Sequence, residues 1–136
     1  MTQDREPPPL RHVREYFRAL EQAPGDERLA SFFVSDVAQR EFPNRLLENG
    51  AQRGLSEMLE GNRRGQKVVQ NQRYIIQNAL VDGERVAVEL CWTAELKVPL
   101  GKLAAGATLT AHCGVFFRFR DGRIAEQHNF DCFESF

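Results

Sequence analysis

Two Asp-Gly dipeptides, each placed between two long runs of strand-forming residues, constrain the fold of this chain more than any other feature. In Asp82-Gly83 and Asp121-Gly122 both positions tolerate positive φ, as a two-residue hairpin turn requires. The second half of the chain is therefore predicted to form an antiparallel meander of four long strands. The expected strands cover residues 68–81, 85–98, 108–120 and 123–133, with a looser connection over residues 99–107.

The first half of the chain carries helical spacing instead. Leu10, Val13, Phe17 and Leu20 predict an amphipathic helix that ends near Gln22. The triple proline that precedes Leu10 suits the first turn of this helix, where a missing N–H costs little.

A short helix and a strand are expected next. Asp26 can cap a short second helix that carries Phe32 and Phe33. Residues 34–42 are then predicted to form a first strand, which Pro43 ends.

A loop is predicted over residues 44–52, followed by a third helix whose apolar stripe lies within residues 55–59. Gly61 and Gly65 are expected to end or weaken this helix, because glycine has a low helix propensity.

Helices followed by a large sheet form the pattern of an α+β domain. The chain has 136 residues, of which 42% are hydrophobic, and this is enough for one packed core. We therefore expect a single domain over residues 1–136, with residues 1–8 as a flexible N-terminal tail.

The alternation of residues 109–119 predicts which face of the sheet is buried. Its odd positions are all apolar, while its even positions are mixed and include His112, Gly114 and Phe116. A mixed second face is typical of a polar-lined cavity or a subunit interface. Gly114 inside a strand indicates a bend or bulge, which a strongly curved sheet requires.

Charge and composition disfavour nucleic acid and membranes as binding partners. Eighteen basic residues are balanced by nineteen acidic ones, whereas a nucleic-acid-binding domain usually carries a basic excess. No apolar run approaches the ~20 residues of a membrane-spanning helix, and residues 1–9 lack the apolar stretch of a signal peptide. We therefore expect a cytoplasmic protein without nucleic-acid or membrane partners.

The cysteines and histidines show no metal-binding pattern. Cys91, Cys113 and Cys132 lie far apart in strand-like stretches, without CxxC spacing, and are expected to be reduced core residues. The three histidines add no ligand pair, so neither a metal nor another cofactor is expected.

The order of elements resembles the SnoaL-like, or nuclear-transport-factor-2-like, superfamily over nearly the whole chain. The segments that carry the resemblance are residues 41–45 (EFPNR), 53–55 (RGL), 72–74 (QRY), 92–93 (WT), 98–101 (VPLG), 121–124 (DGRI) and 129–133 (NFDCF). The resemblance implies a cone-shaped, strongly curved antiparallel sheet wrapped around two to three N-terminal helices. It also implies a deep internal pocket and homodimers formed through the sheet.

The resemblance does not imply one reaction. Members include ketosteroid isomerases, polyketide cyclases, dehydratases, epoxide hydrolases and proteins with no catalysis. Isomerase-like members place an Asp base near the end of the first strand, where this chain has Glu41, and this departure disfavours steroid isomerisation. Cyclase-like members use an Asp late in the chain, and Asp131 resembles it in position.

The candidate catalytic residues are Asp131, His128 and His112. An Asp–His pair can exchange protons with a substrate. Residues three apart in a regular strand face opposite sides, so His128 and Asp131 share a pocket only if a bulge intervenes. The alternatives are structural: Asp131 as an acceptor for an Arg or a loop amide, and His112 as a hydrogen-bonded residue at an interface.

The candidate pocket residues come from the whole chain. Arg45 is expected near the mouth of the cone, where it either clamps a carboxylate or enolate of the substrate or ties its loop to Asp131. The other candidate lining residues are Tyr16, Asn44, Tyr74, Trp92 and Asn129.

The leading hypothesis is a pocket for a small apolar or cyclic organic molecule with cofactor-free acid–base catalysis, of the isomerase, cyclase, dehydratase or hydrolase type. Asp131 would be the base, His128 or His112 the donor, and Arg45 would orient the ligand. The alternative is a non-catalytic ligand-binding or dimeric interaction module on the same scaffold.

Overall fold

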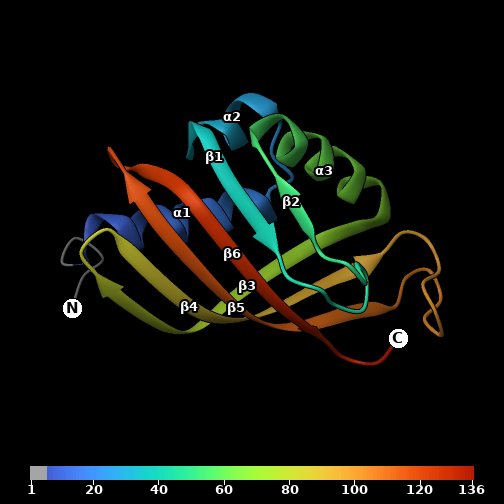
Figure 1. Ribbon diagram of the computed structural model, residues 1–136. Helices are drawn as coiled ribbons and strands as arrows, with labels where there is room; N and C mark the ends of the chain where they lie inside the picture. The colour runs from blue at the N-terminus through green and yellow to red at the C-terminus, as the bar shows by residue number, and fades with distance from the viewer. Residues whose placement is uncertain (1–5) are drawn as a thin grey trace.

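Three helices and one six-stranded sheet make up residues 6–136, the part of the chain that the computed structural model describes (Figure 1). The elements follow the order α1 (Pro8–Glu21), α2 (Asp26–Ala30), β1 (Phe33–Glu41), β2 (Ala51–Arg53), α3 (Leu55–Val68), β3 (Val69–Asp82), β4 (Arg85–Leu96), β5 (Thr108–Arg120) and β6 (Arg123–Phe133). The α+β class is confirmed.

The sheet has the strand order β2-β1-β6-β5-β4-β3. Strands β3 to β6 form the predicted antiparallel meander, and Gly83, Asp121 and Gly122 in its two turns have positive φ. Strand β1 joins β6 in parallel, so the sheet is mixed. The sheet curves strongly, and α1 lies across its inner side (Figure 1).

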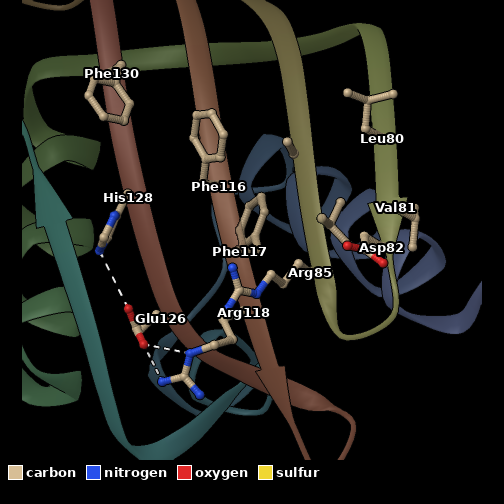
Figure 2. A pocket seen from close by; sticks show the side chains of 12 residues that line it. Leu80, Val81, Asp82, Arg85, Phe116, Phe117, Arg118, Glu126, His128 and Phe130 are labelled. Atoms are coloured by element: carbon tan, nitrogen blue, oxygen red, sulfur yellow. Dashed lines mark hydrogen bonds and ion pairs between the residues drawn. The ribbon is translucent and has the colours of Figure 1, made fainter.

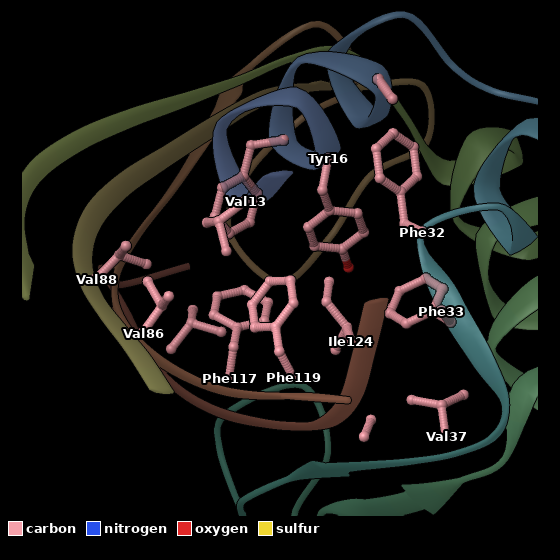
Figure 3. Packing of buried hydrophobic residues seen from close by; sticks show 14 of the residues in the cluster. Val13, Tyr16, Phe32, Phe33, Val37, Val86, Val88, Phe117, Phe119 and Ile124 are labelled. Carbon is pink, nitrogen blue, oxygen red and sulfur yellow. The ribbon is translucent and has the colours of Figure 1, made fainter. Parts of the chain in front are cut away.

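The alternation of buried and exposed residues along β5 determines which of its side chains belong to the core. Every odd residue from Leu109 to Phe119 is buried, and the inward residues of β4 pack beside them. Val13 and Tyr16 of α1 point toward Phe117 and Phe119 of the sheet (Figure 3). The predicted inner and outer faces of the sheet are therefore confirmed, because a period of two leaves one face of a strand apolar.

Two helix boundaries differ from the prediction. Helix α2 ends at Ala30, and Phe33 begins β1 with only 1% of its surface exposed. Helix α3 continues through both glycines to Val68. Its last turns are held from outside the helix, because Asn62 and Gln66 both donate hydrogen bonds to the Pro24 carbonyl, at 3.0 and 3.1 Å.

Two smaller expectations also change. The predicted loop over residues 44–52 ends in β2, which pairs with the last residues of β1. The expected bulge at Gly114 is wrong, since its pairing with Glu89 and Phe130 continues the regular register on both sides. The register shifts instead between Arg118 and Phe119, and twice along β3.

Residues 6–8 of the expected N-terminal tail belong to the described structure. The first helix begins at Pro8, and Glu6 forms an ion pair with Arg14 at 2.9 Å. The rest of the expected tail, residues 1–5, lies outside the described residues. Within residues 6–136, no helix is both long and apolar enough to cross a membrane.

Candidate functional site

An internal pocket lies between the inner face of the sheet and the helices. One chamber of 240 Å³ is lined by Asp131, Cys113, Trp92 and Phe133 together with residues from β1 and β3. An adjoining chamber of 270 Å³ extends toward Tyr16. The two chambers, which we call the inner pocket, share the lining residues Phe17, Glu41, Gln72, Tyr74 and Asn129.

Asp131 is the half-buried carboxylic acid of this pocket. On β6 it pairs with Cys113, and Asn129, two residues earlier, shares its face. Burial raises the pKa of Asp131 to about 6, the nearby Glu41 carboxylate adds to the rise, and a hydrogen bond from the Cys113 thiol opposes it. A carboxyl group tuned in this way can take up and release a proton near neutral pH.

Glu41 is the second carboxyl group in the pocket. It ends β1, and its Oε2 lies 2.8 Å from Nη1 of Arg53 in β2. Its other oxygen accepts a 3.3 Å hydrogen bond from the Asn44 amide. Glu41 is thus compensated by a fixed cation.

A chain of polar side chains leads from Asn129 into the core. The Nε2 atom of Gln127 donates to Oδ1 of Asn129 at 3.1 Å and to the Tyr16 hydroxyl at 3.3 Å. Gln127 is 1% exposed, and its Oε1 has no hydrogen-bond partner among residues 6–136. Burial raises the pKa of Tyr16 to about 12, so this hydroxyl keeps its proton and remains a donor.

The opposite wall is organised around Gln72 of β3. Its Oε1 accepts hydrogen bonds from Trp92 Nε1 at 3.0 Å and from the Tyr74 hydroxyl at 3.2 Å. The Tyr74 ring stacks on Phe17 with a centroid separation of 4.9 Å. Burial places the pKa of Tyr74 well above 10, so it also stays neutral. The pocket therefore combines aromatic walls with neutral polar groups and two carboxyl groups.

Both candidate histidines lie on the outer face of the sheet. His128 lies 3.7 Å from Glu126 and, with Phe116 and Phe130, lines a groove of 540 Å³ that we call the outer groove (Figure 2). No register shift separates His128 from Asp131, so the two residues face opposite sides and the expected Asp–His pair does not form. His112 is exposed and pairs with Glu134 at 2.8 Å, consistent with its structural alternative.

The loop residues have structural contacts. Asn44 lies beside the pocket, where its Oδ1 accepts the backbone N–H groups of Leu46 and Leu47 and shapes the turn after β1. Arg45 is exposed and lies over the Phe136 ring, 5.3 Å from its centroid. The structure therefore brings Arg45 to neither Asp131 nor the pocket lining, and the cation paired with Glu41 is Arg53.

Of the predicted lining residues, Tyr16, Tyr74, Trp92 and Asn129 line the inner pocket. The residues not singled out as site candidates are Glu41, Arg53, Gln72, Gln127 and Cys113. For Gln127 a signal was present, since positions 127, 129 and 131 fall on one face of a strand. Within residues 6–136, no three His, Cys, Asp or Glu side chains cluster as a metal site would require.

A family model for the SnoaL-like domain matches residues 13–127, which is most of the chain. The protein belongs to the SnoaL-like family. No functionally curated protein matches this SnoaL-like chain.

Solved structures share its fold at low sequence identity. IdmH of Streptomyces antibioticus, a candidate polyketide cyclase, superposes with a TM-score of 0.76 at 17% identity, covering 90% of this chain and 91% of that one. A candidate polyketide cyclase of Xanthomonas campestris gives 0.69 at 22% identity, covering 90% and 88%. AclR of Streptomyces galilaeus, a candidate hydroxylase, gives 0.73 at 16% identity, covering 90% and 74%.

Proposed function

We propose that this SnoaL-like protein catalyses proton transfer, of the cyclase or isomerase type, on a small cyclic ketone bound in the inner pocket without a cofactor. The observation that carries the proposal is the placement of Asp131. It is a half-buried carboxyl group with a pKa raised to about 6, at the wall of a chamber whose lining includes Phe17, Tyr74, Trp92 and Phe133.

The expected step is a balanced proton transfer. The Asp131 carboxylate takes a proton from the carbon next to the ketone carbonyl. The C–H electron pair forms a carbon–carbon double bond while the carbonyl π electrons move to oxygen. The enolate then reacts at carbon, and Asp131 returns the proton. The neutral Tyr16 hydroxyl and the Asn129 amide line the same pocket and can donate hydrogen bonds to the enolate oxygen.

Two further observations support this function. Family membership and the shared fold with candidate polyketide cyclases agree with a cyclase-type reaction. The alternative, a non-catalytic binding module, predicts an apolar cavity without inward ionisable groups. The convergence of Glu41 and Asp131 on one chamber counts against that alternative.

Hydrogen–deuterium exchange tests the proposal without knowledge of the natural substrate. The enolisable ketone 2-tetralone is incubated with the protein in D₂O, and NMR follows deuterium uptake at its α-carbons. We expect the wild type to accelerate exchange and Asp131→Asn to lose that acceleration. The matched control is Asp36→Asn, a carboxyl-to-amide change at an exposed residue that pairs with Arg120. Retention of the acceleration by Asp131→Asn, or its loss in His128→Gln, would refute the assignment.

A further inference from the structure

The two carboxyl groups of the inner pocket reach it from adjacent strands. Strand β1 runs parallel to β6, and the Phe42 N–H donates to the Asn129 carbonyl at 3.0 Å. This pairing places Glu41, at the end of β1, beside Asp131, two residues beyond Asn129. Glu41 and Asp131 line the same chamber, where their carboxyl groups interact with each other. Two neighbouring carboxylates repel each other, so such a pair favours a state with one proton.

The surroundings of the pair are asymmetric. Arg53 is fixed on the Glu41 side, because β2 pairs with β1 and places Arg53 opposite Gln39. The two partners of this ion pair are only 19% and 20% exposed, so solvent screens it weakly. On the Asp131 side, the neighbouring group is the neutral Cys113 thiol. The cation lies beside Glu41 alone, so the two carboxyl groups of the pair are not equivalent.

We propose that Glu41 and Arg53 are positioning residues that make Asp131 the proton-carrying member of a carboxyl pair. Glu41 accepts a hydrogen bond from the Asp131 carboxyl once that group has taken a proton, and Arg53 keeps Glu41 charged so that it can do so. This inference rests on the proposed function for its consequence in catalysis. The coupled carboxyl pair, with the proton on Asp131, does not depend on that function.

Three other titratable groups among residues 6–136 interact with Asp131. They are Cys113 on β5, Tyr74 on β3 and Tyr16 on α1, and burial keeps the proton on each of them. The proton balance of the pair is therefore simple. Asp131 gains one proton from the substrate carbon and forms an O–H···O hydrogen bond to Glu41. The same proton leaves when Asp131 returns it to the product.

Carbon-13 NMR of the ligand-free protein tests the pair directly. The Asp131 carboxyl signal, identified by its absence in Asp131→Asn, is titrated in the wild type, in Glu41→Gln and in Arg53→Met. Removing the Glu41 charge should lower the midpoint of Asp131 by about 1 pH unit. Removing Arg53 should raise the pH at which the pair takes up its proton. Arg118→Met, which removes an exposed arginine paired with Glu126 on the outer face, serves as the matched control and should leave the midpoint unchanged.

Opposite shifts in the two variants would support the carboxyl pair, because general destabilisation would not move the midpoint in two directions. Circular dichroism establishes that each variant is folded, and Arg53→Lys, which keeps the cation, should restore the wild-type midpoint. An unchanged Asp131 midpoint in Glu41→Gln, or shifts of the same sign in both variants, would overturn the inference. Opposite shifts combined with full exchange activity in Asp131→Asn would refute the proposed function and leave the pair intact.

Discussion

Cys113 and Asp131 lie directly opposite each other on β5 and β6, and both side chains line the inner pocket. Burial keeps the Cys113 thiol protonated, so it acts as a hydrogen-bond donor to the carboxylate and not as a nucleophile. The thiol therefore favours the charged form of Asp131 and opposes the effect of burial.

Replacing Cys113 should raise the proton affinity of Asp131. In Cys113→Ala the donor is lost, so the pKa of Asp131 should move above about 6, whereas Cys113→Ser keeps a donor and should stay near the wild-type value. The carboxyl titration measured by NMR checks both variants. A lower midpoint in Cys113→Ala would show that the thiol does not donate to Asp131.

Asp131 should also cost stability at alkaline pH. Its pKa is about 6 in the folded protein and near 3.8 in the unfolded chain, so the folded state binds the proton more tightly. The buried Asp131 charge therefore does not lower the free energy of unfolding below pH 4. It lowers it increasingly between pH 4 and 6, and by its full amount above pH 6. Because the site is partly open to solvent, Asp131→Asn should stabilise the protein at pH 8 by on the order of 1–2 kcal/mol. Urea denaturation at pH 8 and pH 4 measures this, and an equal effect at both values would contradict it.

The Gln72 side chain should stabilise the folded protein through the two hydrogen bonds that it accepts. Gln72→Ala leaves the Trp92 and Tyr74 donors without their acceptor, which should cost about 1–3 kcal/mol in the free energy of unfolding. Gln77→Ala, on the same strand but exposed, is the matched control and should stay within ~0.5 kcal/mol of wild type. Equal losses in the two variants would argue against the role of Gln72.

The outer groove should mediate self-association. Phe116 and Phe130 are 54% and 42% exposed, and Phe130 stacks on Phe42 at a centroid distance of 4.2 Å. Such an aromatic cluster on a sheet face suits a second copy of the chain. Light scattering at micromolar concentration should give a dimer for the wild type and a monomer for Phe116→Asp. A wild-type monomer would contradict the prediction.

Much of the fold could be predicted because it depends on local signals. The alternation from Leu109 to Phe119 and the two Asp-Gly turns determine the meander and its buried face. The parallel pairing of β1 with β6 has no such local signal, since residues far apart in the chain decide it. The path of α3 past Gly61 and Gly65 likewise depends on distant contacts with Pro24.

The site was predictable only in part for the same reason. Strand periodicity places Asn129 on the face of Asp131 and separates His128 from it. Asp131 itself is indicated by the family resemblance, and Trp92 by its amphipathic ring. The Glu41–Arg53 ion pair depends on an irregular turn between β1 and β2. That turn needs Gly50 at positive φ, because a Cβ there would clash with the Glu41 carbonyl oxygen. No local signal indicates this turn. The prediction therefore places Arg45 at the site, whereas the structure pairs Arg53 with Glu41 and leaves Arg45 outside the pocket lining.

The pH–rate profile of ketone exchange tests the central claim most directly. With 2-tetralone as the probe, the rate in the wild type should rise with pH through a midpoint near 6, as Asp131 loses its proton and becomes the base. Asp131→Asn should lower the plateau by at least ~100-fold and remove the midpoint. A wild-type profile that is flat between pH 5 and 8, or one that Asp131→Asn leaves unchanged, would contradict the account.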